Sequence, residues 1–203
     1  MAHARDRSVV SPSSVPPRGH GLRLLSWDPG SGADAEVWLR GFLDPDFQRW
    51  NTPLRPVNDL DDVREALRNR AREEAEGRSV SFRITDDATG TALGHVGLNE
   101  INRPLRLARV GYWVLPEARG RGVATRALLL AARHAFTALD LYRLELGHGI
   151  GHGASCRVAE RCGFRLEGTL RGAMFEEGRR DTFRDAHLHA RLADDEEPAP
   201  PGA

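Results

Sequence analysis

The 203-residue chain contains no lysine, and all 29 of its basic side chains are arginine. It therefore has no side-chain amine to act as a nucleophile or to form a Schiff base. The same absence excludes a P-loop nucleotide site, which requires Gly-Lys-Ser/Thr. The formal net charge is zero, which gives no reason to expect nucleic acid or an anionic membrane as a partner.

Cysteine is also scarce, with only Cys156 and Cys162 in the chain. Their spacing matches neither a zinc motif nor a disulfide framework, so we expect reduced thiols. No apolar run approaches the roughly 18 residues of a membrane span. The first residues lack the apolar stretch of a secretion signal. These absences predict a cytoplasmic protein without a membrane partner.

The two ends of the chain differ from its middle. Residues 1–18 mix Ser, Pro and Arg without periodicity, and residues 194–203 are acidic and then proline-rich. Both compositions are typical of disordered segments. Residues 19–193 are patterned throughout, without a linker or an internal repeat, which predicts one domain.

Strand and helix patterns alternate within this domain. Apolar periodicity predicts helices over 33–43, 59–77, about sixteen residues from Gly122, and 154–162. Short β-prone runs predict strands over 22–27, 79–84, 92–98, 109–115, 141–146, 164–168 and 184–192. The interleaving predicts a mixed α/β fold with one central sheet.

One stretch, "GYWVLPEARGRGVATRALLLAARHAF", combines a strand, a glycine-containing loop and a helix. This order points free backbone N–H groups and a helix dipole at one spot, which can bind phosphate. Gly120 and Gly122 let the backbone approach an anion, while Arg119 and Arg121 add charge. The Thr125 hydroxyl is a further candidate donor.

Two other interpretations of this loop fit less well. A dinucleotide-binding fingerprint needs a third glycine, but the pattern here is Gly120-x-Gly122-x-x-Thr125. Arg-Gly runs also occur in RNA-binding tails, yet those tails lack a following amphipathic helix. A phosphate-binding helix start remains the best interpretation.

The run Arg119-x-x-Gly122-x-Ala124 after the Y-W-V-L-P strand resembles the pyrophosphate loop of GNAT acetyltransferases. Downstream, "ASCRVAERCGFRLEGTLRG" is similar to the S-x-x-V-x-x-x-x-G-F-x-x-E-G-x-x-R pattern of their RimJ/RimL-like branch. The resemblance covers residues from about 20 to 193. It implies the GNAT fold, an α/β (α+β) domain with one mixed, mostly antiparallel sheet of six to seven strands. Helices flank that sheet, which is splayed between its two central strands.

The resemblance also implies acetyl-CoA as the co-substrate and no metal. The backbone of Val114 and Leu115 would pair with the pantetheine arm, with His152 as a further contact. The pyrophosphate would bind at a continuous segment formed by Arg119, Gly120, Arg121, Gly122, Val123, Ala124 and Thr125.

The segment "HGIGHGASC" (148–156) provides the candidate acid. The resemblance casts Ser155 as the proton donor to the departing CoA thiolate, although a helix-capping hydroxyl is the alternative. His152 stands where relatives usually have asparagine. Metal binding by His148 and His152 is disfavoured because the intervening glycines oppose a helix and no third ligand is evident. A nucleophile elbow fails because Arg157 occupies a glycine position.

The general base is left open. Many relatives carry glutamate where this chain has Arg109, and another acidic position of some relatives falls on Met174. Glu100, Glu176 or a water chain could replace those acids.

The sequence therefore predicts an N-acetyltransferase that moves acetyl from acetyl-CoA directly to a primary amine in a ternary complex. The branch resemblance favours a protein N-terminal α-amine. A small amine acceptor such as an antibiotic or metabolite, a larger acyl group, and a non-catalytic acyl-CoA-binding sensor remain as alternatives. An RNA-binding module is opposed by the zero net charge. The resemblance further favours a homodimer.

Overall fold

A computed structural model describes residues 15–199, and its strands form one sheet in the order β1-β2-β3-β4-β5-β6-β8-β7. All neighbouring strands are antiparallel except β5 and β6. The strands are β1 (Arg18–Gly19), β2 (Leu22–Ser26), β3 (Val80–Asp86), β4 (Ala92–Asn102), β5 (Leu107–Val114), β6 (Arg143–Gly149), β7 (Arg165–Glu176) and β8 (Arg179–Leu192). The mixed, mostly antiparallel sheet is as predicted. The expected six to seven strands become eight, because the two-residue β1 is too short to show a pattern.

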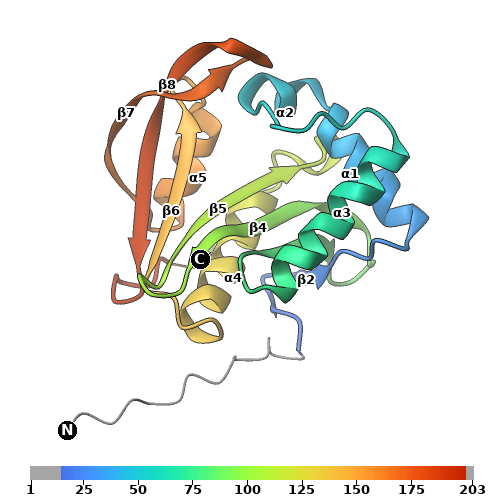
Figure 1. The fold of residues 1–203 in the computed structure, drawn as a ribbon. Helices are drawn as coiled ribbons and strands as arrows, with labels where there is room; N and C mark the ends of the chain where they lie inside the picture. The colour runs from blue at the N-terminus through green and yellow to red at the C-terminus, as the bar shows by residue number, and fades with distance from the viewer. Residues whose placement is uncertain (1–14, 200–203) are drawn as a thin grey trace, which may run out of the picture.

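Helices cover both faces of the sheet (Figure 1). They are α1 (Gly32–Leu43), α2 (Pro45–Trp50), α3 (Leu60–Ala75), a 3-10 turn η1 (Pro116–Ala118), α4 (Val123–Thr137) and α5 (Gly153–Arg161). In α3 the Asp59 side chain accepts hydrogen bonds from the N–H groups of Asp61 and Asp62, while Val63 and Leu67 are buried. Asp59 thus caps the helix predicted over 59–77, and Val63 and Leu67 form its buried side.

Two apolar cores hold the layers together. Trp38 of α1, Leu67 of α3 and Trp113 of β5 belong to the core on one face. Helix α4 contributes Ala127, Leu128 and its neighbours to a larger core on the opposite face. Strand β5 therefore alternates its side chains between the two cores, with Trp113 on one side and Val110 on the other.

Strands β5 and β6 are the splayed pair that the resemblance predicts. They pair in parallel only from Leu107 to Arg109 with Arg143 to Glu145, and then diverge (Figure 1). The edge of β5 beyond Arg109 is consequently not paired with β6. On its other edge β5 pairs with β4, whose register shifts between Asn99 and Asn102.

The ends of the domain differ from the expected boundaries. Most of the two segments predicted to be disordered lies outside the described residues. However, Asp195 accepts a hydrogen bond from the Leu192 N–H, and Glu197 pairs with the buried Arg191. Residues 194–199 thus pack against the domain instead of leaving it at Asp194. Arg18 likewise already belongs to β1. Among residues 15–199, no helix is long and apolar enough to cross a membrane.

Candidate active site

The start of α4 presents backbone donors without protein partners. Gly122 is its N-cap at φ 69° and supplies no side-chain cap. The first-turn N–H groups of a helix have no intrahelical acceptor, so those of Val123, Ala124 and Thr125 are free to bind an anion. Gly120 also has a positive φ of 71°, and a Cβ at either glycine would meet nothing within 4 Å. This open turn fits a diphosphate.

The charged and hydroxyl side chains of this loop differ in their contacts and exposure. Arg119 is paired with Asp44 and Asp46, and its Nε donates to the Val114 carbonyl at 3.1 Å. Its guanidinium therefore braces the loop, and its contact with a phosphate stays a prediction. Thr125 is buried in α4. Arg121 is exposed and remains a candidate phosphate contact.

The two residues predicted to pair with pantetheine differ in whether their backbone groups are available. The Leu115 N–H donates to the Leu93 carbonyl, and its own carbonyl accepts from the Ala118 N–H, so Leu115 is already satisfied. Because successive residues of a strand point their backbone groups to opposite edges, Val114 faces the gap beside β6. Its carbonyl accepts from Arg119, which leaves the Val114 N–H as the available group.

Ser155 lies in the first turn of α5, and its Oγ is 2.9 Å from the Tyr112 hydroxyl. It is buried and is not the helix cap, because His152 occupies the N-cap position. Tyr112 belongs to the unpaired stretch of β5, so the pair lies across the splay. Burial raises the pKa of Tyr112 to about 12, which keeps the phenol protonated at neutral pH. Sequence reasoning missed Tyr112, although it lies in the same strand motif.

His152 is held as a neutral ring. It stacks on Trp50 of α2, with ring centroids 4.4 Å apart and an interplanar angle of 1°. Burial, and secondarily the neighbouring His148, lowers the pKa of His152 to about 4. At neutral pH it can therefore contact pantetheine only as an uncharged donor or acceptor.

The two candidate bases are both engaged elsewhere. Glu100 pairs with Arg109 at 3.0 Å, and Glu176 pairs with Arg179 at 2.8 Å beside the turn between β7 and β8. Within residues 15–199 neither carboxylate is hydrogen-bonded to Ser155 or Tyr112. Glu145 was not considered in the sequence analysis. This residue is the register partner of Arg109 at the last pair before the splay, and its carboxylate lies 3.8 Å from the Arg109 guanidinium.

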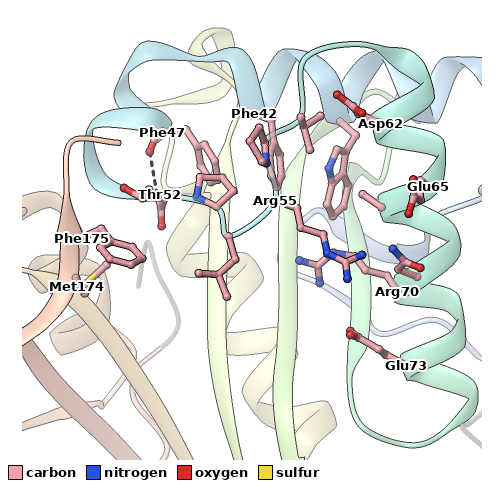
Figure 2. A pocket seen from close by; sticks show the side chains of 18 of the residues that line it. Phe42, Phe47, Thr52, Arg55, Asp62, Glu65, Arg70, Glu73, Met174 and Phe175 are labelled. Carbon is pink, nitrogen blue, oxygen red and sulfur yellow. Dashed lines mark hydrogen bonds between the residues drawn. The ribbon is translucent and has the colours of Figure 1, made fainter. Parts of the chain in front are cut away.

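A cavity of about 910 Å³ lies between α3 and the β7–β8 hairpin. Figure 2 shows Asp62, Glu65 and Glu73 along α3, with Met174 and Phe175 on the opposite side. Arg55 and Arg70 also line it, so the walls carry both signs of charge. A second cavity of about 590 Å³ adjoins it, because both are lined by Phe42, Asn51, Thr52, Pro53, Pro56 and Val57.

Comparison with curated proteins gives relatives with two kinds of acceptor. A putative ribosomal N-acetyltransferase of Bacillus subtilis is 33% identical over 89 residues, and the match covers 44% of this chain and about half (49%) of that protein. The ribosomal-protein-serine acetyltransferase of Escherichia coli is 27% identical over 78% of this chain and 82% of that protein. A spermidine N(1)-acetyltransferase of Vibrio cholerae is 31% identical over 61% of this chain and 69% of that protein.

Solved structures agree on the fold. RimL, a ribosomal L7/L12 α-N-protein acetyltransferase solved with coenzyme A, has a TM-score of 0.79 at 20% identity, covering 90% of this chain and 100% of that one. Mycobacterium smegmatis RimJ, in complex with CoA-disulfide, has a TM-score of 0.76 at 27% identity, covering 87% and 85%. The family model described as "Acetyltransferase (GNAT) domain" matches residues 23–165. With the open helix start and the splayed strands, these matches place the chain in the GNAT family, as an acetyl-CoA-dependent N-acetyltransferase of the RimJ/RimL-like type.

Proposed function

We propose that this enzyme acetylates the N-terminal α-amine of a protein. The observation that carries the proposal is the pair of adjoining cavities, of about 910 and 590 Å³, between α2, α3 and the β7–β8 hairpin. Small-molecule pockets span about 300–1,000 Å³. The first cavity already lies near the upper end of this range, and the second cavity extends it. Together they form a groove that is better suited to an extended peptide than to a compact amine.

The charge of the groove supports an ammonium group near α3. Asp62, Glu65 and Glu73 line that wall and would attract the positively charged end of an acceptor. Arg55 and Arg70 lie among them, so the wall is less acidic than a site for a polycation would need to be. One positive charge followed by neutral or acidic residues fits this mixture.

Among residues 15–199, neither Glu100 nor Glu176 is hydrogen-bonded to Ser155 or Tyr112, and this also favours an α-amine. Its pKa of about 8 leaves part of it neutral at pH 7, whereas a lysine amine at about 10.4 requires stronger deprotonation. The neutral nitrogen attacks the thioester carbonyl, and the carbon–sulfur bond breaks. Ser155 then gives its proton to the leaving sulfur, while Tyr112 holds the serine by their 2.9 Å hydrogen bond. The proton lost by the amine passes to water, and Ser155 regains a proton from water, so the net transfer is one proton from nitrogen to sulfur.

The Gly122 turn and the first amides of α4 would hold the pyrophosphate of acetyl-CoA, and the Val114 N–H would hold the pantetheine arm. His152 adds an uncharged contact. These residues orient the thioester toward the splay, where Ser155 lies.

A second candidate acceptor is a polyamine. The 31% identity to a spermidine acetyltransferase and the three carboxylates along α3 favour it. Spermidine would place its amines against Asp62, Glu65 and Glu73, leaving the adjoining cavity without a role.

Release of free CoA thiol separates these acceptors. The acceptors are peptides with free N-termini, the same peptides blocked at the N-terminus but carrying one lysine, and spermidine. We expect the highest kcat/KM with free α-amines and almost none with the blocked peptides. Higher kcat/KM with spermidine than with every peptide would overturn the proposal in favour of the polyamine. Binding of CoA without thiol release for any amine would indicate a sensor.

A further inference from the structure

Strands β6 and β8 bring three histidines to one face of the sheet. His148 is the register partner of His187, and His189 follows two residues later on the same face of β8. Helix α5 covers this face and places Cys156 beside them. One ligand atom from each of the four side chains lies within 4.8 Å of all the others.

The hydrogen bonds of two rings fix their tautomers. His148 Nδ1 lies 3.1 Å from the Gly149 carbonyl, and His189 Nδ1 lies 3.3 Å from the Phe164 carbonyl. A carbonyl oxygen can only accept, so Nδ1 carries the hydrogen in both neutral rings. Their Nε2 atoms, which then have only lone pairs, are 3.2 Å apart. Two lone pairs at this distance are stable together only with a cation shared between them.

Two of the separations between these ligand atoms are close to those of tetrahedral coordination. With metal–nitrogen bonds of about 2.0 Å and metal–sulfur bonds of about 2.3 Å, ligand atoms around zinc are separated by about 3.3 Å (N to N) and about 3.6 Å (N to S). The observed separations are 3.2 Å between the Nε2 atoms and 3.8 Å from Cys156 Sγ to His189 Nε2. His187 adds a fourth donor, and its buried Nδ1 has no hydrogen-bond partner among residues 15–199.

The surroundings also suit a metal. Metal-ligating histidines commonly donate their second nitrogen to a backbone carbonyl, as His148 and His189 do here. Cys156 and His187 are half-buried, so an ion can reach the cluster from solvent. His148 and His189 are buried and lie on its inner side. One thiolate with three imidazoles is a donor set that zinc favours.

We propose that His148, Cys156, His187 and His189 form a tetrahedral Zn²⁺ site. From the sequence, only His148 with His152 were weighed as metal ligands, and acetyl transfer itself still uses acetyl-CoA without a metal. Binding forms one Zn–S and three Zn–N bonds while the aqueous ion releases its bound waters, and the Cys156 thiol gives up its proton. Glu160, whose carboxylate accepts from that thiol at 3.4 Å, is the nearby acceptor for it. No oxidation or reduction is involved.

The ion would take no part in acetyl transfer. Cys156 directly follows Ser155 at the start of α5, so the metal would tie this helix end to β6 and β8 and hold Ser155 in place. The site is thus a positioning device for the start of α5. Metal binding is measured without an acceptor amine, so its test does not depend on the proposed function.

Cobalt titration of the full chain, freed of metal with EDTA, tests the site. We expect one Co²⁺ per chain, with the intense visible absorption of tetrahedral cobalt and a thiolate-to-cobalt band in the near ultraviolet. Zn²⁺ should displace the cobalt and raise the Tm. Cys156→Ser should abolish the thiolate band, and His187→Gln should weaken affinity at least about tenfold.

Two matched variants serve as controls. Cys162→Ser removes the other thiol, and His20→Gln removes an exposed histidine, so both should keep the cobalt spectrum. Circular dichroism verifies that each variant is folded. Absence of binding by folded wild-type protein at micromolar Co²⁺ or Zn²⁺ would overturn the proposal and leave a shared proton between the rings. Binding that survives both Cys156→Ser and His187→Gln would overturn it too.

Discussion

The hydroxyl of Tyr112 lies 2.9 Å from Oγ of Ser155, and this contact joins β5 to α5 across the splay of the sheet. Burial raises the pKa of Tyr112 to about 12, so the phenol keeps its hydrogen at neutral pH. When that hydrogen is donated to Oγ, the serine hydrogen is free to point at a leaving sulfur. Tyr112 is therefore a positioning residue for the proposed acid.

Tyr112→Phe should lower kcat about tenfold, which corresponds to the loss of one hydrogen bond of about 1.4 kcal/mol, and leave KM for acetyl-CoA unchanged. The chain has one other tyrosine, Tyr142, whose exposed hydroxyl donates to Asp194. Tyr142→Phe is the matched control and should be fully active. Steady-state kinetics measure kcat and KM for both variants. A Tyr112→Phe enzyme with wild-type kcat would show that the contact has no catalytic role.

Ser155→Ala should lower kcat about 100-fold, the scale of a general acid, without loss of CoA affinity. The control is Ser81→Ala, because Ser81 is also buried and its Oγ has no hydrogen-bond partner. Isothermal titration with CoA is run beside thiol release. If Ser155→Ala lost CoA affinity in proportion to its activity, Ser155 would be a binding residue.

Gly122→Ala should weaken CoA binding about tenfold, because a residue with Cβ at φ 69° is strained and shifts the first amides of α4. Gly90→Ala provides the control: its φ is 75°, a Cβ there also meets nothing within 4 Å, and it lies in the β3–β4 turn. Both variants should lose about 1 kcal/mol of unfolding free energy. Equal CoA affinities in the two variants would contradict the assignment of the phosphate loop.

Elements with strong local signals could be predicted from the sequence. The apolar spacing in α3 gave its bounds within two residues. The α2 helix was missed because its six residues are too short for a period to show, although Asp44 caps it and Pro45 opens it. Local pattern is reliable only where an element spans several turns.

Contacts between distant segments could not be predicted. The alternation of side chains along a strand places His187 and His189 of "HLHAR" on one face, but their approach to His148 depends on the β6–β8 register. Arg119 was expected to bind phosphate because its charge is evident from the sequence. Its partners Asp44 and Asp46 lie about 75 residues away in the chain, so the pairing follows only from the fold.

Gly41→Ala should destabilise the protein by about 2 kcal/mol, the scale of overpacking a core. A Cβ at Gly41 would lie 2.4 Å from the Trp113 ring in the core between α1 and β5. Gly32→Ala, in the same helix, meets nothing within 4 Å and should be neutral or slightly stabilising. Urea unfolding followed by circular dichroism compares them, and equal midpoints would show that the Trp113 contact is not tight.

His152→Asn should make the protein less sensitive to acid. The pKa of His152 is lowered to about 4 by burial, against an ordinary value of 6.5. Below pH 6.5 the His152 ring binds a proton in the unfolded chain but not in the folded protein. The free energy of unfolding therefore falls as the pH drops toward 4. Between pH 7 and 5 this costs at most about 2 kcal/mol. Asparagine cannot titrate, so this contribution is absent from the variant. Urea unfolding at the two pH values, with EDTA present, should therefore show the larger loss in the wild type, and equal losses would mean that the His152 ring is solvated.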